Sequence, residues 1–483
     1  MFYHSTRSKQ KMLSSKEAIL KGISEDGGLF VSDQLGEETV NLEGIENLDY
    51  YALAERVLAV LIPDYSGEEL RTCIRNAYTG KFASEALTPV TKIGDHWLLE
   101  LYHGPTQAFK DMALCMLPQF MSVALKGQNR KVQILTATSG DTGKAALAGF
   151  ANAENIGITV FFPHGKVSDI QYLQMVTQEG NNVSVAAVRG NFDDCQTGVK
   201  NIFIGETDRI SERYGVSLSS ANSINVGRLV PQVVYYFEAY RQLLAGGKIR
   251  KGQKLDFCVP TGNFGDVLAG WYARKIGLPV GKLIVASNEN KVLYDFLTTG
   301  VYDRNREFVK TISPSMDILI SSNLERLLYY VSGCSCELVN TWMNDLKTTG
   351  KFKVSEDVLE KIRADFDCGY ATNEESRRAI REAWEKDGRL IDPHTAVGYH
   401  VIRNLRPGTV LLSTASPFKF AADVYGSVFG EECLSGGFEY MEQLSAKTGE
   451  KVPQALAALR EKPILHKDVI DISEMKAFTE GKL

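Results

Sequence analysis

The amino-acid sequence predicts an α/β fold built on parallel, doubly wound sheet. From about residue 89, short runs rich in β-branched and aromatic residues are each followed by a glycine-containing turn and a stretch of helical periodicity. The runs lie in residues 131–154, 157–168, 254–277, 282–290 and 408–420. Strands that alternate with helices pair in parallel, because each helix carries the chain back to the end where the next strand begins. At 483 residues the chain is long enough for a large two-lobed enzyme.

Both ends of the chain and one internal segment are predicted to be helical. Residues 1–88 lack β-rich alternation and contain YYALAERVLAVLI and GEELRTCIRNAY, each apolar on one side, which predicts a helical N-terminal domain. Residues 335–390 predict a helical insertion, in which Thr372 and Glu375 have the spacing of a capping box. The segment 431–483 predicts a helical tail.

Composition and charge favour a small-molecule partner. The 54 basic and 59 acidic residues give a net charge of −5 and are spread along the chain, so nothing indicates binding to nucleic acid or to a membrane surface. The N-terminus lacks an apolar signal segment, and the eight cysteines and seven histidines lack metal-ligand spacing. We therefore expect a cytoplasmic protein without a bound metal.

The sequence VPTGNFGD predicts a phosphate-binding loop between a strand and a helix. It contains Gly262, Asn263, Phe264, Gly265 and Asp266. The glycines let the backbone approach an anion closely, and the helix that follows offers free N–H groups and the positive end of its dipole. An ordinary tight turn between strand and helix is the alternative interpretation.

A second strand-to-helix loop contains Ser139, Gly140, Asp141 and Thr142. It differs from a nucleoside-triphosphate P-loop, which requires glycine at position 138 and a hydroxyl residue at position 145. The chain has Thr138 and Ala145 instead. Such a loop either holds a substrate α-carboxylate on backbone N–H groups or caps its helix.

Lys110 is the third candidate, in the segment HGPTQAFKDMA. Its apolar neighbours Phe109 and Met112 suggest that the amine is partly desolvated, which lowers its pKa and makes it available for a Schiff base. On its own, a solvated surface lysine is the alternative. Together with a phosphate loop and an anion-binding helix terminus, however, an imine-forming lysine meets the requirements of pyridoxal phosphate.

The motifs HGPTQAFKDMAL, ATSGDTG, NSINVGRL, VPTGNFGDVLAG and DPHTAVGY, in this order, resemble those of threonine synthases. YHSTR, EDGGLFV, FDDCQ and SMDILISSNLERL extend the resemblance over nearly the whole chain. It implies two α/β lobes of the fold-type II pyridoxal-phosphate enzymes, similar to the β subunit of tryptophan synthase. It also implies the conversion of O-phosphohomoserine and water to threonine and phosphate. One departure is ASPFKF at residues 415–420, where the family has a stretch like AHPAKF.

The resemblance also implies roles for individual residues. Lys110 binds the cofactor covalently, the 262–266 loop holds the cofactor phosphate, and Thr414 faces the pyridine nitrogen. The substrate-binding set consists of Ser139, Gly140, Asp141, Thr142, Ser223, Asn225 and Arg228. Lesser candidates for the substrate phosphate are Lys144, Ser5, Thr6 and Arg7. Arg228 is the strongest candidate, since a planar guanidinium binds phosphate through two hydrogen bonds, although a surface ion pair would also explain it.

The expected lobes are a smaller mobile one at 125–230 and a larger cofactor-binding one at 89–124 and 231–430. We expect a monomer or a homodimer. Two other functions fit the same motifs. A phospho-lyase would release a keto acid from phosphohomoserine or a related γ-phosphate, and a binding protein would keep the fold without catalysis.

Overall fold

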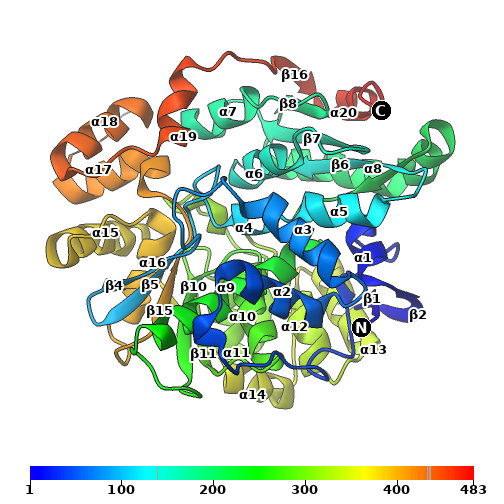
Figure 1. The fold of residues 1–483 in the computed structure, drawn as a ribbon. Coiled ribbons are helices and arrows are strands. Elements are labelled where there is room, and N and C mark those ends of the chain that lie inside the picture. The colour runs from blue at the N-terminus through cyan, green and yellow to red at the C-terminus, as the bar shows by residue number, and fades with distance from the viewer. Residues whose placement is uncertain (139, 432, 434–436) are drawn as a thin grey trace.

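The computed structural model describes residues 1–138, 140–431, 433 and 437–483, and it confirms the α/β class. Two main sheets lie one above the other in Figure 1. Ser139, one of the predicted substrate-binding residues, lies outside the described residues.

The larger sheet has six strands in the order β14-β11-β10-β15-β5-β4. All neighbours pair in parallel except β4 and β5, which are antiparallel. The strands are β4 (Val90–Ile93), β5 (His96–Glu100), β10 (Leu255–Pro260), β11 (Val280–Ser287), β14 (Phe366–Tyr370) and β15 (Val410–Ser413). The central strands β10 and β15 end beside each other, so the loops that follow them meet at one edge.

The smaller sheet has five parallel strands in the order β16-β8-β7-β6-β9. They are β6 (Lys131–Ala137), β7 (Ile156–Pro163), β8 (Val183–Arg189), β9 (Val216–Ser219) and β16 (Asp468–Asp471). Helices α6 (Asp141–Phe150), α7 (Asp169–Val176) and α8 (Phe192–Tyr214) connect the first four strands. Each is preceded by a strand, as the alternating pattern of the sequence predicts.

Five of the described helices pack directly on strands of the larger sheet (Figure 1). They are α9 (Val226–Ala245), α10 (Gly265–Lys275), α11 (Val292–Thr299), α14 (Glu356–Asp365) and α16 (Pro393–Ile402). Further helices pack on these or on one another: α4 (Lys110–Leu114), α5 (Leu117–Leu125), α12 (Leu324–Val331), α13 (Cys336–Thr348), α15 (Asn373–Asp387) and α17 (Ala421–Phe429). The predicted capping box at Thr372 and Glu375 starts α15.

The N-terminal region contains the predicted helices α2 (Tyr50–Leu61) and α3 (Gly67–Tyr78), preceded by α1 (Ser15–Lys21). It also contains a small antiparallel sheet of β1 (Tyr3–Ser5), β2 (Ser8–Leu13) and β3 (Phe30–Val31). These strands are short, and β2 is largely exposed, so apolar alternation does not reveal them. The domain boundaries from the sequence stay a prediction.

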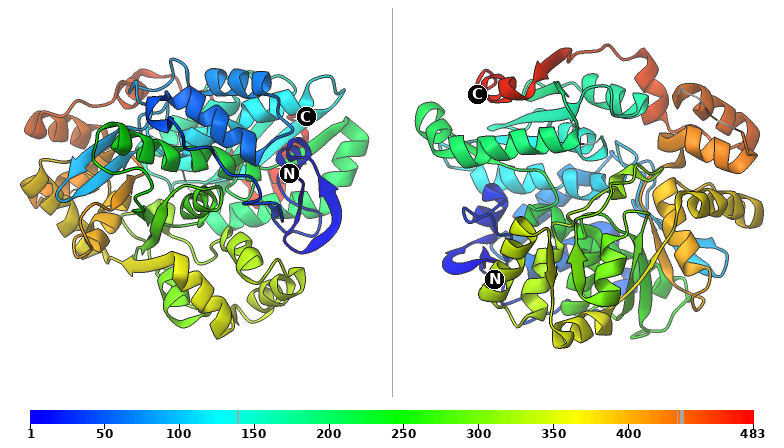
Figure 2. Two further views of the ribbon diagram at one scale, coloured as in Figure 1. Left: turned by 60° about the horizontal axis from the view of Figure 1, so that its bottom comes forward. Right: turned by 180° about the vertical axis from the view of Figure 1, so that it is seen from behind.

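Two segments predicted as helical also contain strands. The insertion carries β13 (Lys351–Lys353), which pairs with β12 (Val301–Asp303), and β14, which forms an edge of the larger sheet. In the tail, α18 (Gly437–Thr448) and α19 (Gln454–Ala457) are followed by β16 and α20 (Met475–Glu480). Figure 2 shows how this tail runs back across the smaller sheet, where β16 joins the edge at β8.

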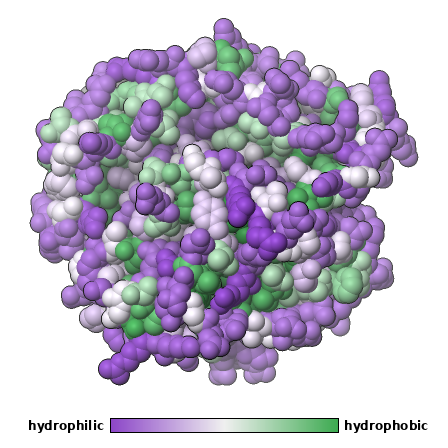
Figure 3. Space-filling model, in the orientation of Figure 1, coloured by the Kyte–Doolittle hydropathy of each residue, from purple (hydrophilic) through white to green (hydrophobic). Residues whose placement is uncertain are grey.

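The surface in Figure 3 is mainly polar, with apolar residues scattered among charged ones. Within the described ranges, no helix combines the length and the apolar character that crossing a membrane requires.

Candidate active site

Lys110 is the first residue of α4 and is held beside the end of β15. The N–H of Phe109 donates to the carbonyl of Thr414 at 2.8 Å, and Ala108 forms a β-bridge with Ala415. The Lys110 side chain is 11% exposed, and its amine lies 3.4 Å from Ser315 Oγ. Lys110 and Thr414, two of the predicted site residues, therefore lie close together in the fold, although they are far apart in the sequence.

The amine of Lys110 loses its proton more easily than an ordinary lysine. Burial lowers its pKa to about 8, and the positive charges of Lys419 and Arg228 contribute in the same direction. Asp141 and Asp111 oppose the shift. A large fraction of the amine is consequently neutral near pH 8, as nucleophilic attack on an aldehyde requires.

Asp141 begins α6 and reaches from the smaller sheet toward Lys110. Its Oδ2 lies 3.9 Å from the Lys110 amine and accepts a hydrogen bond of 3.2 Å from Ser315 Oγ. Its Oδ1 lies 2.7 Å from the amine of Lys419 and accepts from Gln171 at 3.2 Å. Burial alone raises the pKa of Asp141, but the two lysines outweigh it and keep the pKa well below its usual range. Asp141 is therefore a buried carboxylate.

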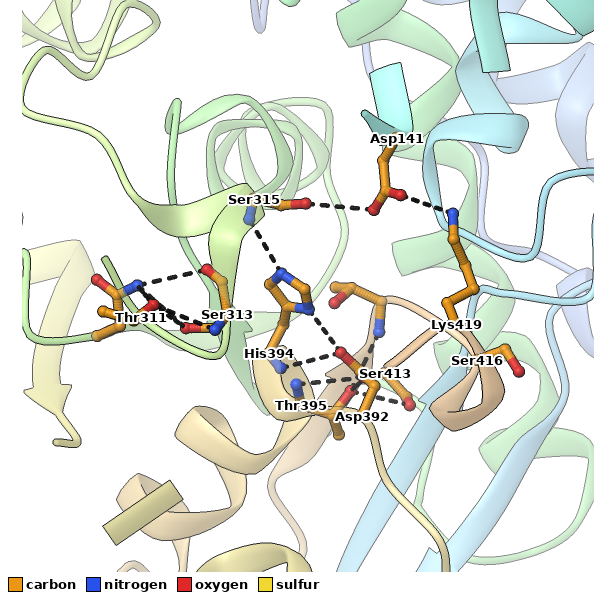
Figure 4. A network of polar contacts seen from close by, with 12 residues as sticks. Asp141, Thr311, Ser313, Ser315, Asp392, His394, Thr395, Ser413, Ser416 and Lys419 are labelled. Carbon is orange, nitrogen blue, oxygen red and sulfur yellow. Dashed lines mark hydrogen bonds and ion pairs between the residues drawn. The ribbon is translucent and has the colours of Figure 1, made fainter. Parts of the chain in front are cut away.

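Ser315 connects Asp141 to a buried histidine (Figure 4). The backbone N–H of Ser315 donates to Nε2 of His394 at 3.1 Å. The other ring nitrogen, Nδ1, lies 2.7 Å from Asp392 Oδ1, so it carries the proton and the ring is oriented by a carboxylate. Asp392 also caps α16 by accepting from the N–H groups of His394 and Thr395.

The 262–266 loop joins β10 to α10 and is supported by the segment that contains Ser315. Phe264 adopts the left-handed conformation with φ 63°, which turns the chain into the helix. Ser321 Oγ donates to the carbonyl of Gly262 at 2.7 Å, and the N–H and the side-chain amide of Asn323 both donate to the carbonyl of Asn263 at 3.1 Å. A Cβ on Gly262 would lie 2.9 Å from the carbonyl oxygen of Ser315. Position 262 therefore has no room for a side chain, and the N–H groups of the first turn of α10 have no partner within the helix. Phosphate binding by this loop stays a prediction.

Asp266 ends this loop in a buried position between two tyrosines. It accepts hydrogen bonds from the hydroxyls of Tyr235 and Tyr236 on α9, while its Oδ2 has no hydrogen-bond partner among the described residues. Burial raises the pKa of Asp266 to about 7, against the lowering effect of the tyrosines and of Lys110. Asp266 consequently changes charge near neutral pH.

Arg228, in the first turn of α9, is a buried guanidinium, and no carboxylate among the described residues contributes to its pKa. One nitrogen donates to the carbonyl of Ala221 at 3.1 Å, and Nε has no partner among the described residues. Burial lowers its pKa to about 10. A buried cation without a counter-ion is costly, so an anion supplied by a ligand explains its place better than a surface ion pair does.

Other predicted residues are engaged in the fold. Asn225 caps α9, and its amide donates to the carbonyls of Ile19 and Ser220, both at 3.0 Å. Thr6 and Arg7 bind Glu325. Ser5 donates to Asp26 at 2.8 Å. The structure does not bring these hydroxyls and Arg7 into contact with Lys110, and their role in substrate binding stays a prediction.

The remaining candidates lie near the two loops. A Cβ on Gly265 would lie 3.9 Å from the Ser223 side chain, which places Ser223 beside the 262–266 loop. Thr138 Oγ1 accepts from the N–H groups of Gly140 and Gly143, both at 2.9 Å. Thr142 is in the first turn of α6. Lys144 is buried and donates to Gln178 at 2.6 Å.

Known proteins similar to this chain decide its family. The model of the family described as "Pyridoxal-phosphate dependent enzyme" matches residues 82–414, and the model described as "Threonine synthase N terminus" matches residues 2–78. Threonine synthase from Eremothecium gossypii is 37% identical, with 100% of this chain and 98% of that protein covered.

The chain belongs to the threonine synthase family. The crystal structure of pyridoxal-phosphate-bound threonine synthase from Brucella melitensis has a TM-score of 0.87 at 35% identity, covering 100% of this chain and 99% of that one. The yeast threonine synthase structure has a TM-score of 0.88 at 34% identity, covering 100% and 98%. The human protein named "Threonine synthase-like 1" is 39% identical over 84% of this chain and 56% of its own length.

As a member of the threonine synthase family, the chain is a pyridoxal-phosphate-dependent enzyme. The residues present fit this cofactor. Lys110 offers a partly deprotonated amine, and the 262–266 loop with the start of α10 offers backbone N–H groups to a phosphate. The close contact at Gly262 shows that a side chain there would disturb this loop.

Sequence reasoning assigned no role to four residues that the structure links to Asp141 by hydrogen bonds or an ion pair, directly or through one another: Ser315, Asp392, His394 and Lys419. Ser315 and the pair Asp392 and His394 lie in SMDILISSNLERL and DPHTAVGY, two motifs that carried the resemblance. Lys419 lies in PFKF, and its signal was a lone lysine between two phenylalanines just after a buried strand.

Proposed function

We propose that this enzyme converts O-phospho-L-homoserine and water to L-threonine and phosphate. The observation that carries the proposal is the surplus of buried positive charge around Lys110. The three basic groups Lys110, Lys419 and Arg228 lie among two buried carboxyl groups that act on them, Asp141 and Asp111. Such a site suits a small substrate that carries a carboxylate and a phosphate.

We assign the substrate phosphate to Arg228, with Ser223 beside it. A guanidinium offers two parallel hydrogen bonds to phosphate oxygens, and Arg228 has no acidic partner to release among the described residues. The positive end of α6, at Gly140, Asp141 and Thr142, is assigned to the substrate carboxylate. With this assignment, the substrate phosphate binds at α9 and the substrate carboxylate binds at α6.

Lys110 is assigned the proton transfers at the substrate carbon skeleton. Bound pyridoxal phosphate supplies an electron sink that acidifies the Cα–H bond of the substrate. Because its pKa is lowered to about 8, the Lys110 amine is able to accept this proton near neutral pH and to return a proton later. Arg228 stabilises the charge that builds on the phosphate oxygens as the phosphate leaves.

A neutral hydroxyl, Thr414, is assigned to the pyridine nitrogen of the cofactor. It is buried at the end of β15, and its carbonyl fixes the residue before Lys110. Unlike a carboxylate, a hydroxyl does not hold the ring nitrogen protonated, so the electron sink is milder and side transamination is less favoured.

The phospho-lyase and the non-catalytic protein are the competing functions. The described site keeps Lys110, the 262–266 loop and Thr414 together, which favours a catalyst over a binding protein. The test is to supply O-phosphohomoserine and to measure phosphate, threonine and keto acid in one reaction. Equal release of phosphate and threonine is expected. Phosphate with keto acid and ammonia would identify the phospho-lyase, and no phosphate release would indicate a binding protein.

The substrate is thus proposed to be a small phosphorylated amino acid, with neither nucleic acid nor membrane as partner. A cytoplasmic location and a monomeric or homodimeric state also stay predictions.

A further inference from the structure

The Asp141 carboxylate is shared unequally among the groups that surround it. Lys419 is fully buried, with 0% of its side chain exposed, and among the described residues Asp141 is its ion-pair partner at 2.7 Å. Lys110, by contrast, lies 3.9 Å from the other oxygen. One carboxylate between two buried ammonium groups is therefore paired closely with one of them and only loosely with the other.

An ion pair and two hydrogen bonds engage the two oxygens of Asp141. The Lys419 amine lies 2.7 Å from Oδ1, and Ser315 donates to Oδ2 at 3.2 Å (Figure 4). Gln171 donates to Oδ1 at 3.2 Å. Oδ2 is the oxygen that faces Lys110. With the described residues, the Lys110 amine consequently keeps long polar contacts, at 3.4 Å to Ser315 Oγ and 3.9 Å to Asp141 Oδ2.

We propose that Lys419 is a positioning residue of the active site, which takes Asp141 as its counter-ion and so leaves the Lys110 amine available for the cofactor. The proposal rests on the proposed role of Lys110 as the amine that binds the cofactor. It also gives Asp141 a function, as the group that allows a lysine to be buried at this point.

Removal of Lys419 would leave a buried carboxylate whose nearest cation is Lys110. An unpaired buried charge is costly, so Asp141 would then pair with the Lys110 amine and hold its proton. A protonated amine has no lone pair and does not attack an aldehyde. The other charged groups that face Lys110 are Arg228, Asp111 and Asp266. The positive charge of Lys419 also lowers the pKa of Asp111, so removal of Lys419 acts on Asp111 as well as on Asp141.

The positions of Asp141 and Lys419 on two different parts of the fold support this role. Asp141 comes from α6, over the smaller sheet, and Lys419 comes from the short 3-10 helix at Pro417–Phe420, which follows β15. Lys110 lies at the start of α4, which packs against α6. The ion pair therefore fixes the start of α6 against the end of the larger sheet at the place where Lys110 must stay reactive.

The test is competitive acetylation of the full chain without cofactor, followed over a range of pH by mass spectrometry of the Lys110 peptide. For the unaltered chain, reactivity should rise with a midpoint near pH 8. In Lys419→Met the midpoint should rise by at least about one pH unit, which makes acetylation below the midpoint roughly tenfold slower. Addition of Asp141→Asn to Lys419→Met should bring the midpoint back down, since the carboxylate that lies 3.9 Å from the Lys110 amine is then removed.

A Lys16→Met variant is the matched control, because it removes a lysine from the ion pair with Glu69 at 2.9 Å outside the site. It should leave the midpoint of Lys110 unchanged. Lys419→Gln, which loses the charge but keeps a polar side chain, provides the same measurement if the methionine variant does not fold. An unchanged midpoint in the Lys419 variants, or a raised midpoint that Asp141→Asn does not lower, would overturn the proposal. Acetylation requires neither substrate nor turnover, so its outcome is independent of the reaction proposed above.

Discussion

Tyr235 donates a hydrogen bond of 2.5 Å to Asp266 Oδ1, which joins the middle of α9 to the first turn of α10. Tyr236 adds a second link, from its hydroxyl to the carbonyl of Asp266 at 2.8 Å. The 262–266 loop therefore ends on a residue that is held by the hydroxyls of two tyrosines. Because α9 also carries Arg228, this link connects the proposed binding sites of the two phosphates.

Asp266→Asn should change how the stability of the protein depends on pH. The folded protein keeps the Asp266 proton up to a pH of about 7, whereas the unfolded chain releases it near pH 4. The stability that the protonated form contributes is thus present below pH 4 and is lost as the pH rises toward 7, by up to about 4 kcal/mol. Asparagine does not titrate, so the variant should lose less stability between pH 5 and 8. Urea unfolding of both proteins at the two pH values measures this; equal losses would contradict the assignment.

Gly262→Ala should weaken retention of pyridoxal phosphate. Its Cβ would lie 2.9 Å from the carbonyl oxygen of Ser315, so the loop or the Ser315 segment must shift. Gly205→Ala is the matched control, since a Cβ there meets no atom within 4 Å. Dialysis followed by absorbance of the bound cofactor should show loss from the first variant only. Equal retention of the cofactor by both variants would show that a methyl group fits at position 262, and it would contradict the prediction.

Arg228→Gln should leave the colour of the bound cofactor intact and impair the use of phosphohomoserine. Charge-assisted contacts of this kind are worth roughly 1.5–3 kcal/mol, so kcat/KM should fall by about 10- to 150-fold. Arg228→Lys should recover part of the loss, because it restores the charge without the two parallel hydrogen bonds. Steady-state kinetics of phosphate release provides the comparison, and unaltered kinetics in Arg228→Gln would remove Arg228 from the site.

Substrate binding is expected to close the smaller lobe on the larger one. A ligand drives such a motion only through contacts that exist when it bridges both sides, and α6 and Arg228 offer them on separate elements. Hydrogen exchange at residues 140–144 and 222–228 should slow when an unreactive phosphonate analogue is added. The same exchange with and without the analogue would indicate a rigid, preformed site.

Much of the fold could be predicted because its signals are local. The alternation of strands and helices and the capping box at Thr372 and Glu375 are visible within a few residues of sequence. Among the strands that were not predicted, β14 and β16 depend on partners that are distant in the sequence. β16 is largely exposed and is a strand because it pairs with β8, nearly 300 residues away, as its register shows.

The candidate site also contains residues with a local signal in the sequence and residues without one. Lys110 and the 262–266 loop lie in motifs whose neighbouring residues indicate their chemistry. Lys419 and Ser315 acquire their importance from Asp141, which approaches them from another sheet. Arg7 illustrates the opposite case: its basic side chain suited a phosphate, but the fold pairs it with Glu325. Such pairings follow from tertiary packing, which composition and spacing do not encode.

Borohydride reduction of the purified holoenzyme, followed by peptide mapping, tests most directly whether Lys110 is the amine that binds pyridoxal phosphate. Reduction makes the cofactor linkage permanent, so the modified peptide identifies the lysine by its mass. The account predicts one labelled peptide, carrying the cofactor on Lys110, and no label in Lys110→Ala. Label on Lys144, Lys419 or any other lysine would contradict it.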